Sequence, residues 1–143
     1  MDDKNKERTG SEKPAKTILL VDDEAVSREK IGTILGRQGY AVIDRSDALS
    51  ALAVVSQGTP AVDLVITDYR MPDMDGIEFA RELKRKIPDT PLIMITGHTD
   101  IESYLKALNI GVFEYLNKPI IAHELVRIVS LALKQRNEER DPD

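Results

Sequence analysis

Polar side chains that can do chemistry stand at the ends of four short apolar runs of this sequence. In chain order they are Asp22, Asp23, Asp68, Thr96 and Lys118. If the runs are parallel strands, these three carboxylates, one hydroxyl and one ammonium group share a single rim of the sheet. Clustered carboxylates repel one another, and a bound cation relieves that repulsion. Because the ligands are oxygen atoms only, the set predicts a hard ion, with Mg²⁺ as the natural candidate.

The predicted site has the parts that phosphoryl transfer needs. Mg²⁺ takes few protein carboxylates and keeps several waters, so we expect Asp23 and Asp68 as direct ligands and Asp22 through water. A carboxylate beside Mg²⁺ and Lys118 is well placed to attack phosphorus, because both cations neutralise charge on the transferring oxygens. The hydroxyl of Thr96 can donate to a phosphoryl oxygen.

The segments that must position these residues alternate between strand and helix patterns. Continuous apolar runs favour buried strands over 17–21, 64–67 and 92–96, with weaker candidates over 41–43 and 113–116. Amphipathic spacing predicts helices over 25–37, 48–55, 77–86, 101–108 and 121–135. Five β-α units in succession predict an α/β fold, with a parallel sheet and helices on both of its faces.

Length and composition favour one domain and exclude several classes of site. The chain has 143 residues, no cysteine and a formal net charge of −5. Disulfides and thiolate metal sites are therefore excluded, and the two histidines do not form a zinc pattern. The absence of a basic run argues against direct nucleic-acid binding. Residues 1–16 are expected to be a disordered leader, 17–135 the folded domain, and 136–143 a polar tail.

Nothing in the sequence predicts insertion into a membrane. No apolar run approaches the roughly 20 residues needed to span a bilayer. The charged beginning MDDKNKERTG is followed by no apolar stretch that could serve as a signal peptide. We therefore expect the chain in the cytoplasm.

Four motifs, each at a predicted strand end, resemble those of one family. They are VDD at 21–23, TDYRMPDMDG at 67–76, ITG at 95–97 and YLNKP at 115–119. Over residues 17–135 the chain is similar to the receiver domain of two-component response regulators, the CheY-like superfamily. The resemblance implies a flavodoxin-like (βα)5 fold with a five-stranded parallel sheet in the order 2-1-3-4-5.

The resemblance also implies a role for each matching residue around the phosphorylation site. Asp68 resembles the phospho-acceptor, and Asp22 with Asp23 resembles the acidic pair that helps to bind Mg²⁺. Arg70 stands where the family uses a backbone carbonyl as a metal ligand. Lys118 resembles the lysine that contacts the phosphoryl group, and the bond to the following proline is implied to be cis.

Two further residues resemble the parts of the family's switch. Thr96 matches the hydroxyl that turns toward the phosphoryl group, and Tyr115 matches the aromatic residue that rotates inward on activation. Arg70 and His98 occupy positions two residues after Asp68 and Thr96, where variable side chains tune the lifetime of the phosphoryl group. The direction of that effect in this chain stays open.

The function implied is that of a phosphorylation switch. A sensor histidine kinase or a histidine phosphotransfer protein would donate the phosphoryl group to Asp68, and the receiver would catalyse only its own phosphorylation and dephosphorylation. Signalling would pass to a downstream protein through the face formed by segments 101–108, 113–116 and 121–135. We expect no output domain to follow, and therefore expect output through protein contacts or onward phosphate relay. The cognate kinase, the stimulus, a possible homodimer and origin from a longer protein stay open.

Three alternatives compete with this interpretation. A phosphorylation-independent pseudo-receiver is disfavoured because such modules typically lose part of the acidic set, which is complete here. A phosphatase with an aspartate nucleophile needs a second aspartate two positions later, where this chain has Arg70. The stretch DMDG resembles part of a calcium loop, but the preceding Met71-Pro72 breaks that pattern, and a turn with Asp75 capping the next helix is favoured.

Overall fold

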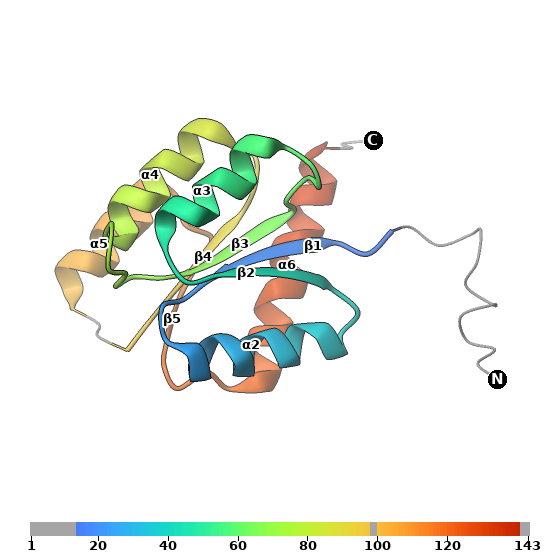
Figure 1. Ribbon diagram of the computed structural model, residues 1–143, viewed down its shortest axis with the longest axis horizontal. Coiled ribbons are helices and arrows are strands. Elements are labelled where there is room, and N and C mark those ends of the chain that lie inside the picture. Colours follow the sequence, from blue (N-terminus) through green and yellow to red (C-terminus); the bar gives the residue numbers. More distant parts are fainter. Residues whose placement is uncertain (1–13, 98–99, 141–143) are drawn as a thin grey trace.

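The computed structural model describes residues 14–97 and 100–140 of the chain. Over these residues a parallel sheet of five strands in the order β2-β1-β3-β4-β5 lies between two layers of helices (Figure 1). The predicted fold class and strand order are therefore confirmed. His98 and most of the expected leader lie outside the described residues.

The elements alternate strictly along the chain. The strands are β1 (Thr17–Val21), β2 (Ala41–Arg45), β3 (Leu64–Asp68), β4 (Leu92–Thr96) and β5 (Glu114–Asn117). The helices are α2 (Ala25–Arg37), α3 (Ala48–Gln57), α4 (Gly76–Lys86), α5 (Ile101–Ile110) and α6 (Ala122–Arg140). In the described part of the chain, no helix has the length and apolar character that crossing a bilayer requires.

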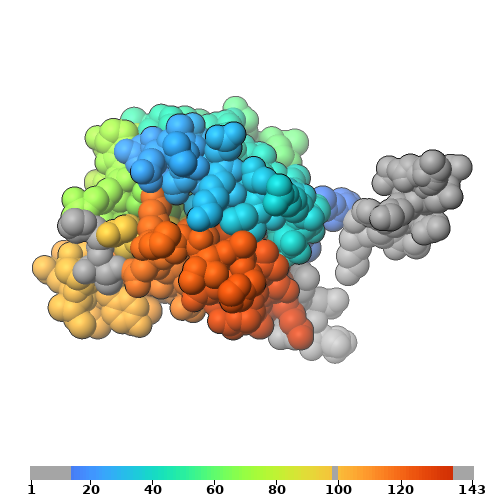
Figure 2. All heavy atoms as spheres, turned by 90° about the horizontal axis from the view of Figure 1, so that it is seen from below, coloured from blue at the N-terminus to red at the C-terminus, as the bar shows by residue number. Residues whose placement is uncertain are grey.

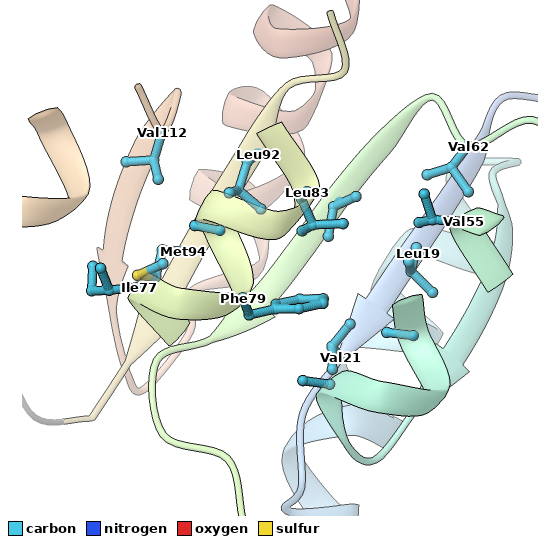
Figure 3. Close-up of a cluster of buried hydrophobic side chains, with 14 of the residues drawn as sticks. Leu19, Val21, Val55, Val62, Ile77, Phe79, Leu83, Leu92, Met94 and Val112 are labelled. Carbon is cyan, nitrogen blue, oxygen red and sulfur yellow. The ribbon is translucent and has the colours of Figure 1, made fainter. Parts of the chain in front are cut away.

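The apolar strands form two separate cores because successive side chains point to opposite faces of a sheet. From β1, Leu19 and Val21 join the core beneath α3, α4 and α5, part of which Figure 3 shows around Phe79. Ile18 and Leu20 join the second core, which α2 and α6 cover (Figure 1). This burial on both faces explains why β1, β3 and β4 are continuous apolar runs.

Several element boundaries differ from those predicted by the sequence pattern. The strand β2 continues to Arg45, two residues past the predicted end, and its half-exposed edge position explains its weak apolar signal. The helix α6 continues to Arg140, five residues beyond the predicted end at 135. Its polar last turns carry no apolar stripe, and therefore no periodic signal. The predicted domain limits themselves stay a prediction.

Aspartate side chains cap three of the helices. Asp47, Asp75 and Asp100 each accept a hydrogen bond from the backbone N–H three residues later, at the start of α3, α4 and α5. The predicted turn with Asp75 as a helix cap is thus confirmed. At the start of α2 the corresponding residue is Glu24, whose side chain makes no capping hydrogen bond.

The parallel register brings the carboxyl ends of four strands to one edge of the sheet. Val21 pairs with Thr67, Asp68 with Ile95, and Thr96 with Asn117. The residues that follow or end these strands therefore lie side by side at one rim, where open α/β sheets place their ligands.

Candidate functional site

Three carboxylates meet at this rim. Asp22, Asp23 and Asp68 each offer an oxygen atom, and these atoms all lie within 4.8 Å of one another. Asp22 and Asp68 are buried, with 2% and 7% of their surface exposed, whereas Asp23 is open to solvent. A donor set of carboxylate oxygens with one open side fits a hard divalent cation such as Mg²⁺.

The lysine reaches the same cluster from the end of β5. Lys118 Nζ lies 3.0 Å from Asp68 Oδ2 and 3.2 Å from Asp22 Oδ2. Its backbone N–H donates to the carbonyl of Thr96 at 2.8 Å, which fixes the segment after β5 against the end of β4. The bond between Lys118 and Pro119 is cis, as the family resemblance implies.

Burial and charge pull the ionisation of this pair in opposite directions. Burial raises the pKa of Asp68 above its ordinary value, and the nearby ammonium of Lys118 opposes this only in part. Burial would lower the pKa of Lys118, but the carboxylates of Asp68 and Asp22 outweigh it and the pKa is raised. Lys118 therefore stays protonated, while ionisation of the Asp68 carboxyl is made harder by burial, and a further cation would ease it.

A tightly closed loop follows the candidate phospho-acceptor. The N–H of Arg70 donates to Asp68 Oδ1 at 3.2 Å, and the N–H of Gly76 donates to the Tyr69 carbonyl at 2.7 Å. At the tip of the loop, the carboxylate of Asp73 accepts from the N–H groups of Ala48 and Leu49 at the start of α3, at 3.1 and 2.9 Å. The loop is thus anchored at its beginning, tip and end.

Gly76 allows the two ends of this loop to approach each other. A Cβ atom added at Gly76 would lie 2.7 Å from the Tyr69 Cα and 2.9 Å from the Tyr69 carbonyl oxygen. Both of these atoms belong to the backbone and cannot turn aside as a side chain would. Glycine is therefore required by close backbone approach at this position.

The predicted residues surround one open hollow at the rim. It is lined by Asp23, Glu24, Asp68, Arg70, Thr96, Gly97 and Lys118. Thr96 is only 1% exposed and Arg70 is exposed. The structure therefore brings together the residues that the sequence pattern singled out for metal binding and phosphoryl transfer, while the role of each stays a prediction.

The predicted switch residue Tyr115 lies buried behind this rim. The residue is 8% exposed, and its ring packs edge to face against Tyr104, with the ring centroids 5.4 Å apart and the planes at 85°. Its hydroxyl is buried without a hydrogen-bond partner among the described residues. Burial, followed by the proximity of Asp100 and Tyr69, raises the pKa of Tyr115. Tyr104, the other ring of this pair, lies on α5 and is exposed.

Glu24 belongs to the site although the sequence pattern did not predict it. Glu24 Oε1 lies 3.2 Å from Lys118 Nζ, so the lysine contacts a third carboxylate. The sequence feature that could have indicated it is the unbroken acidic run Asp22-Asp23-Glu24. Its third residue was not singled out because an acidic residue is common at the beginning of a helix.

Comparisons with known proteins agree with this geometry. The family described as the response regulator receiver domain matches residues 18–130. The phosphate regulon transcriptional regulatory protein PhoB of Pseudomonas aeruginosa is 37% identical over 122 residues, which cover 84% of this chain and 52% of PhoB. The regulatory protein AtoC of Escherichia coli is 34% identical over 124 residues, which cover 87% of this chain and 26% of AtoC. The chain spans about half the length of the first relative and about a quarter of the second.

Solved receiver structures have the same fold. A response regulator receiver domain protein from Clostridium thermocellum superposes with a TM-score of 0.80 at 32% identity, covering 85% of this chain and 97% of that one. A CheY-like receiver domain protein from Methanospirillum hungatei gives a TM-score of 0.83 at 29% identity, covering 87% and 98%. Sequence, fold and rim geometry therefore agree that the chain belongs to the response regulator receiver family of two-component signalling modules.

Proposed function

We propose that this receiver accepts a phosphoryl group on Asp68 and uses it to change the protein-binding properties of one face. The observation that carries the proposal is the setting of the Asp68 carboxylate. One of its oxygens lies 3.0 Å from Lys118 Nζ, and two further carboxylates lie within 4.8 Å, as a site for a divalent cation requires. An aspartate between an ammonium group and a cation site is suited to attack phosphorus.

The chain's own residues divide the work of transfer. Asp68 attacks the phosphorus of a phosphohistidine, its new O–P bond forms as the P–N bond breaks, and the imidazole leaves. The Lys118 ammonium lies beside the oxygen Asp68 Oδ2, and the Arg70 N–H holds Oδ1. Mg²⁺, held by Asp22, Asp23, Asp68 and the backbone carbonyl of Arg70, would supply neutralisation of charge on the transferring oxygens. The hydroxyl of Thr96 then donates to the bound phosphoryl group.

The response passes from Thr96 to Tyr115 and the outer surface. Both side chains are buried on the adjacent strands β4 and β5, where Tyr115 pairs with Met94, two residues before Thr96, so a movement of Thr96 would change the space available to the Tyr115 ring. Packed side chains of this kind switch between discrete arrangements, and a local charge event biases the equilibrium between them. The phosphoryl group would thereby change the face formed by α5, β5 and α6.

The exposed side of α5 supports a protein as the downstream partner. Ile101, Leu105 and Leu108 follow one another at helical spacing and are 74%, 55% and 45% exposed. An apolar stripe of this kind on a helix surface favours contact with another protein. The partner is a downstream target protein, and a second copy of the receiver is the alternative occupant of the same face.

The donor of the phosphoryl group would be a sensor histidine kinase or a histidine phosphotransfer protein. This assignment rests on membership of the receiver family and on the complete set of acidic residues and lysine at the rim. PhoB and AtoC are both longer than this chain, and the name of PhoB describes a transcriptional regulatory protein. Whatever regulation the whole protein performs would follow from the partner of its receiver.

Beryllofluoride, which mimics a phosphoryl group on aspartate, tests the proposal directly. With Mg²⁺ present, the amide resonances of Asp68, Thr96 and Tyr115 should shift in the NMR spectrum. Incubation with acetyl phosphate should add the mass of one phosphoryl group to the intact chain, and Asp68→Asn should remove that addition. If the spectrum and the mass of the wild-type chain both stay unchanged, the chain is a phosphorylation-independent binding module instead.

A further inference from the structure

Glu24 stands at a helix-capping position but points its carboxylate elsewhere. The residue in this position accepts a hydrogen bond from the third helical N–H in α3, α4 and α5, and it is aspartate each time. In α2 the N–H of Ser27 would be the equivalent donor, and Glu24 does not accept from it. Glutamate, one methylene longer than aspartate, forgoes the local cap, which typically stabilises a helix by about 1 kcal/mol.

The Glu24 carboxylate contacts Lys118 instead. Its Oε1 atom lies 3.2 Å from Lys118 Nζ, although the two residues are 94 positions apart in the sequence. The contact crosses from the start of α2 to the segment after β5, and Figure 2 shows the first turns of α2 (blue) beside that segment (orange). The backbone of Glu24 is held in place, since its N–H donates to Asp22 Oδ1 at 2.9 Å.

Lys118 is consequently shared among three carboxylates. Its ammonium group has three N–H donors, and Asp68, Asp22 and Glu24 lie at 3.0, 3.2 and 3.2 Å. Asp68 and Asp22 are buried and anchored by the strand ends, whereas the Glu24 side chain is 63% exposed. Of the three, Glu24 is therefore the partner that can leave most readily, and it lines the hollow that would receive the phosphoryl group.

We propose that Glu24 is a positioning residue that holds Lys118 in the resting receiver and competes with the incoming phosphoryl group for the lysine ammonium. This inference rests on the proposed function. As the O–P bond to Asp68 forms and the donor's bond to phosphorus breaks, the new phosphoryl oxygens take the place of the Glu24 carboxylate beside Lys118. The departing Glu24 side chain moves into solvent, and the acidic rim loses one of its four negative groups.

The competition has a definite consequence for binding of an anion. In Glu24→Gln, the weaker neutral partner no longer competes for Lys118, and one negative charge is removed from the rim. At saturating Mg²⁺, the variant should bind beryllofluoride about two- to fivefold more tightly than the wild-type chain, the range expected for an exposed charge pair. The factor should shrink as salt is added, because salt screens exposed charges. Titration followed by NMR measures both quantities.

Two companion variants separate competition from general charge and from folding. Glu29→Gln removes the same charge from the exposed side of the same helix, and its affinity for beryllofluoride should equal that of the wild-type chain. Glu24→Asp keeps the charge but is short enough to cap Ser27, as the other three helices do. It should raise the melting temperature and also tighten beryllofluoride binding, by a smaller factor than Glu24→Gln.

The outcomes decide between this inference and the proposed function. If the wild-type chain binds beryllofluoride and Glu24→Gln binds it equally well or more weakly, the competition is refuted while the proposed function stands. An equal gain in Glu29→Gln would also refute it, because net charge would then account for the effect. A wild-type chain that binds no beryllofluoride would refute the proposed function and this inference with it.

Discussion

Replacement of Gly76 by alanine would press a methyl group against the backbone of the loop that carries Arg70. The new Cβ would lie 2.7 Å from the Tyr69 Cα, about 0.7 Å short of ordinary van der Waals contact. Tyr69 cannot yield easily. Its N–H donates to the Ile95 carbonyl at 3.0 Å, and its own carbonyl accepts from Gly76 at 2.7 Å. One of these hydrogen bonds must therefore lengthen or the loop must move.

The expected cost follows from two opposing effects. Inserting a methyl group into a site with no room typically destabilises a protein by about 1–3 kcal/mol. Alanine is intrinsically favoured over glycine within a helix by up to about 1 kcal/mol, and Gly76 is the first residue of α4. The steric effect is the larger, so Gly76→Ala should lower the free energy of unfolding by about 1–2 kcal/mol. For a chain of this size the melting temperature falls by roughly 2–4 °C per kcal/mol.

Urea denaturation of both the variant and a matched control measures this difference. Gly36 lies in α2, and a Cβ added there meets nothing within 4 Å. Gly36→Ala should therefore raise the free energy of unfolding by about 0.5–1 kcal/mol through helix preference alone. The same chemical change at two glycines should thus act with opposite signs.

The loop position adds a functional readout to the stability measurement. Because Tyr69 and Arg70 are adjacent, the displaced loop in Gly76→Ala should also weaken Mg²⁺ binding, measured by calorimetry, while Gly36→Ala should leave it unchanged. If Gly76→Ala is as stable as the wild-type chain and binds Mg²⁺ equally well, the close approach of the two loop ends is not a constraint and the reasoning is wrong.

Three further perturbations have expected outcomes. Asp73→Ala removes the acceptor of the Ala48 and Leu49 N–H groups and should cost about 0.5–1 kcal/mol in urea denaturation at neutral pH. Desolvation would raise the pKa of Asp73, but hydrogen bonds from backbone N–H groups outweigh it and the pKa is lowered. The difference in unfolding free energy between Asp73→Ala and the wild-type chain should therefore vanish as the pH falls through that pKa. A difference that stays constant with pH would contradict the capping role. Burial raises the pKa of Asp68 in the folded chain, so the protonated carboxyl contributes stability at low pH, and this contribution is lost as the pH rises through that pKa. Asp68→Asn should therefore have a higher melting temperature than the wild-type chain at pH 7 without Mg²⁺, but not near pH 3. An unchanged melting temperature at pH 7 would count against this reasoning. Arg136→Met should cost about 1–3 kcal/mol in urea denaturation, because the Asp63 carboxylate loses its 2.8 Å ion pair in a partly buried site; a neutral effect would show that water replaces the guanidinium.

Burial pattern made much of the fold predictable. The runs TILLV, LVIT and LIMIT are apolar at successive positions because β1, β3 and β4 are covered by helices on both sides. A strand buried on both faces can therefore be recognised from its sequence as a continuous apolar run. The edge strand β2 was predicted too short because it is covered less completely. Boundaries failed where polar residues continue an element, as at the end of α6.

The candidate site was predictable where residue type and strand end coincide. Asp22, Asp68 and Lys118 each combine a reactive group with a position directly beyond an apolar run, and parallel strands bring such positions together. Glu24 and Asp73 were not predicted, because each has a local explanation as a helix or turn residue. Their contacts, to Lys118 and to the start of α3, depend on rotamers and on segments 94 and 24–25 positions away.

The edge-to-face pair of Tyr104 and Tyr115 gives the protein an optical label of its own. The chain contains no tryptophan and only four tyrosines, so its absorption near 280 nm and its ultraviolet emission arise from those four phenol rings. Two of the four are in mutual contact, and a third, Tyr69, is close enough to influence the ionisation of Tyr115. Rotation of one ring would therefore alter near-ultraviolet dichroism and tyrosine emission of the unmodified chain, with little background from residues elsewhere.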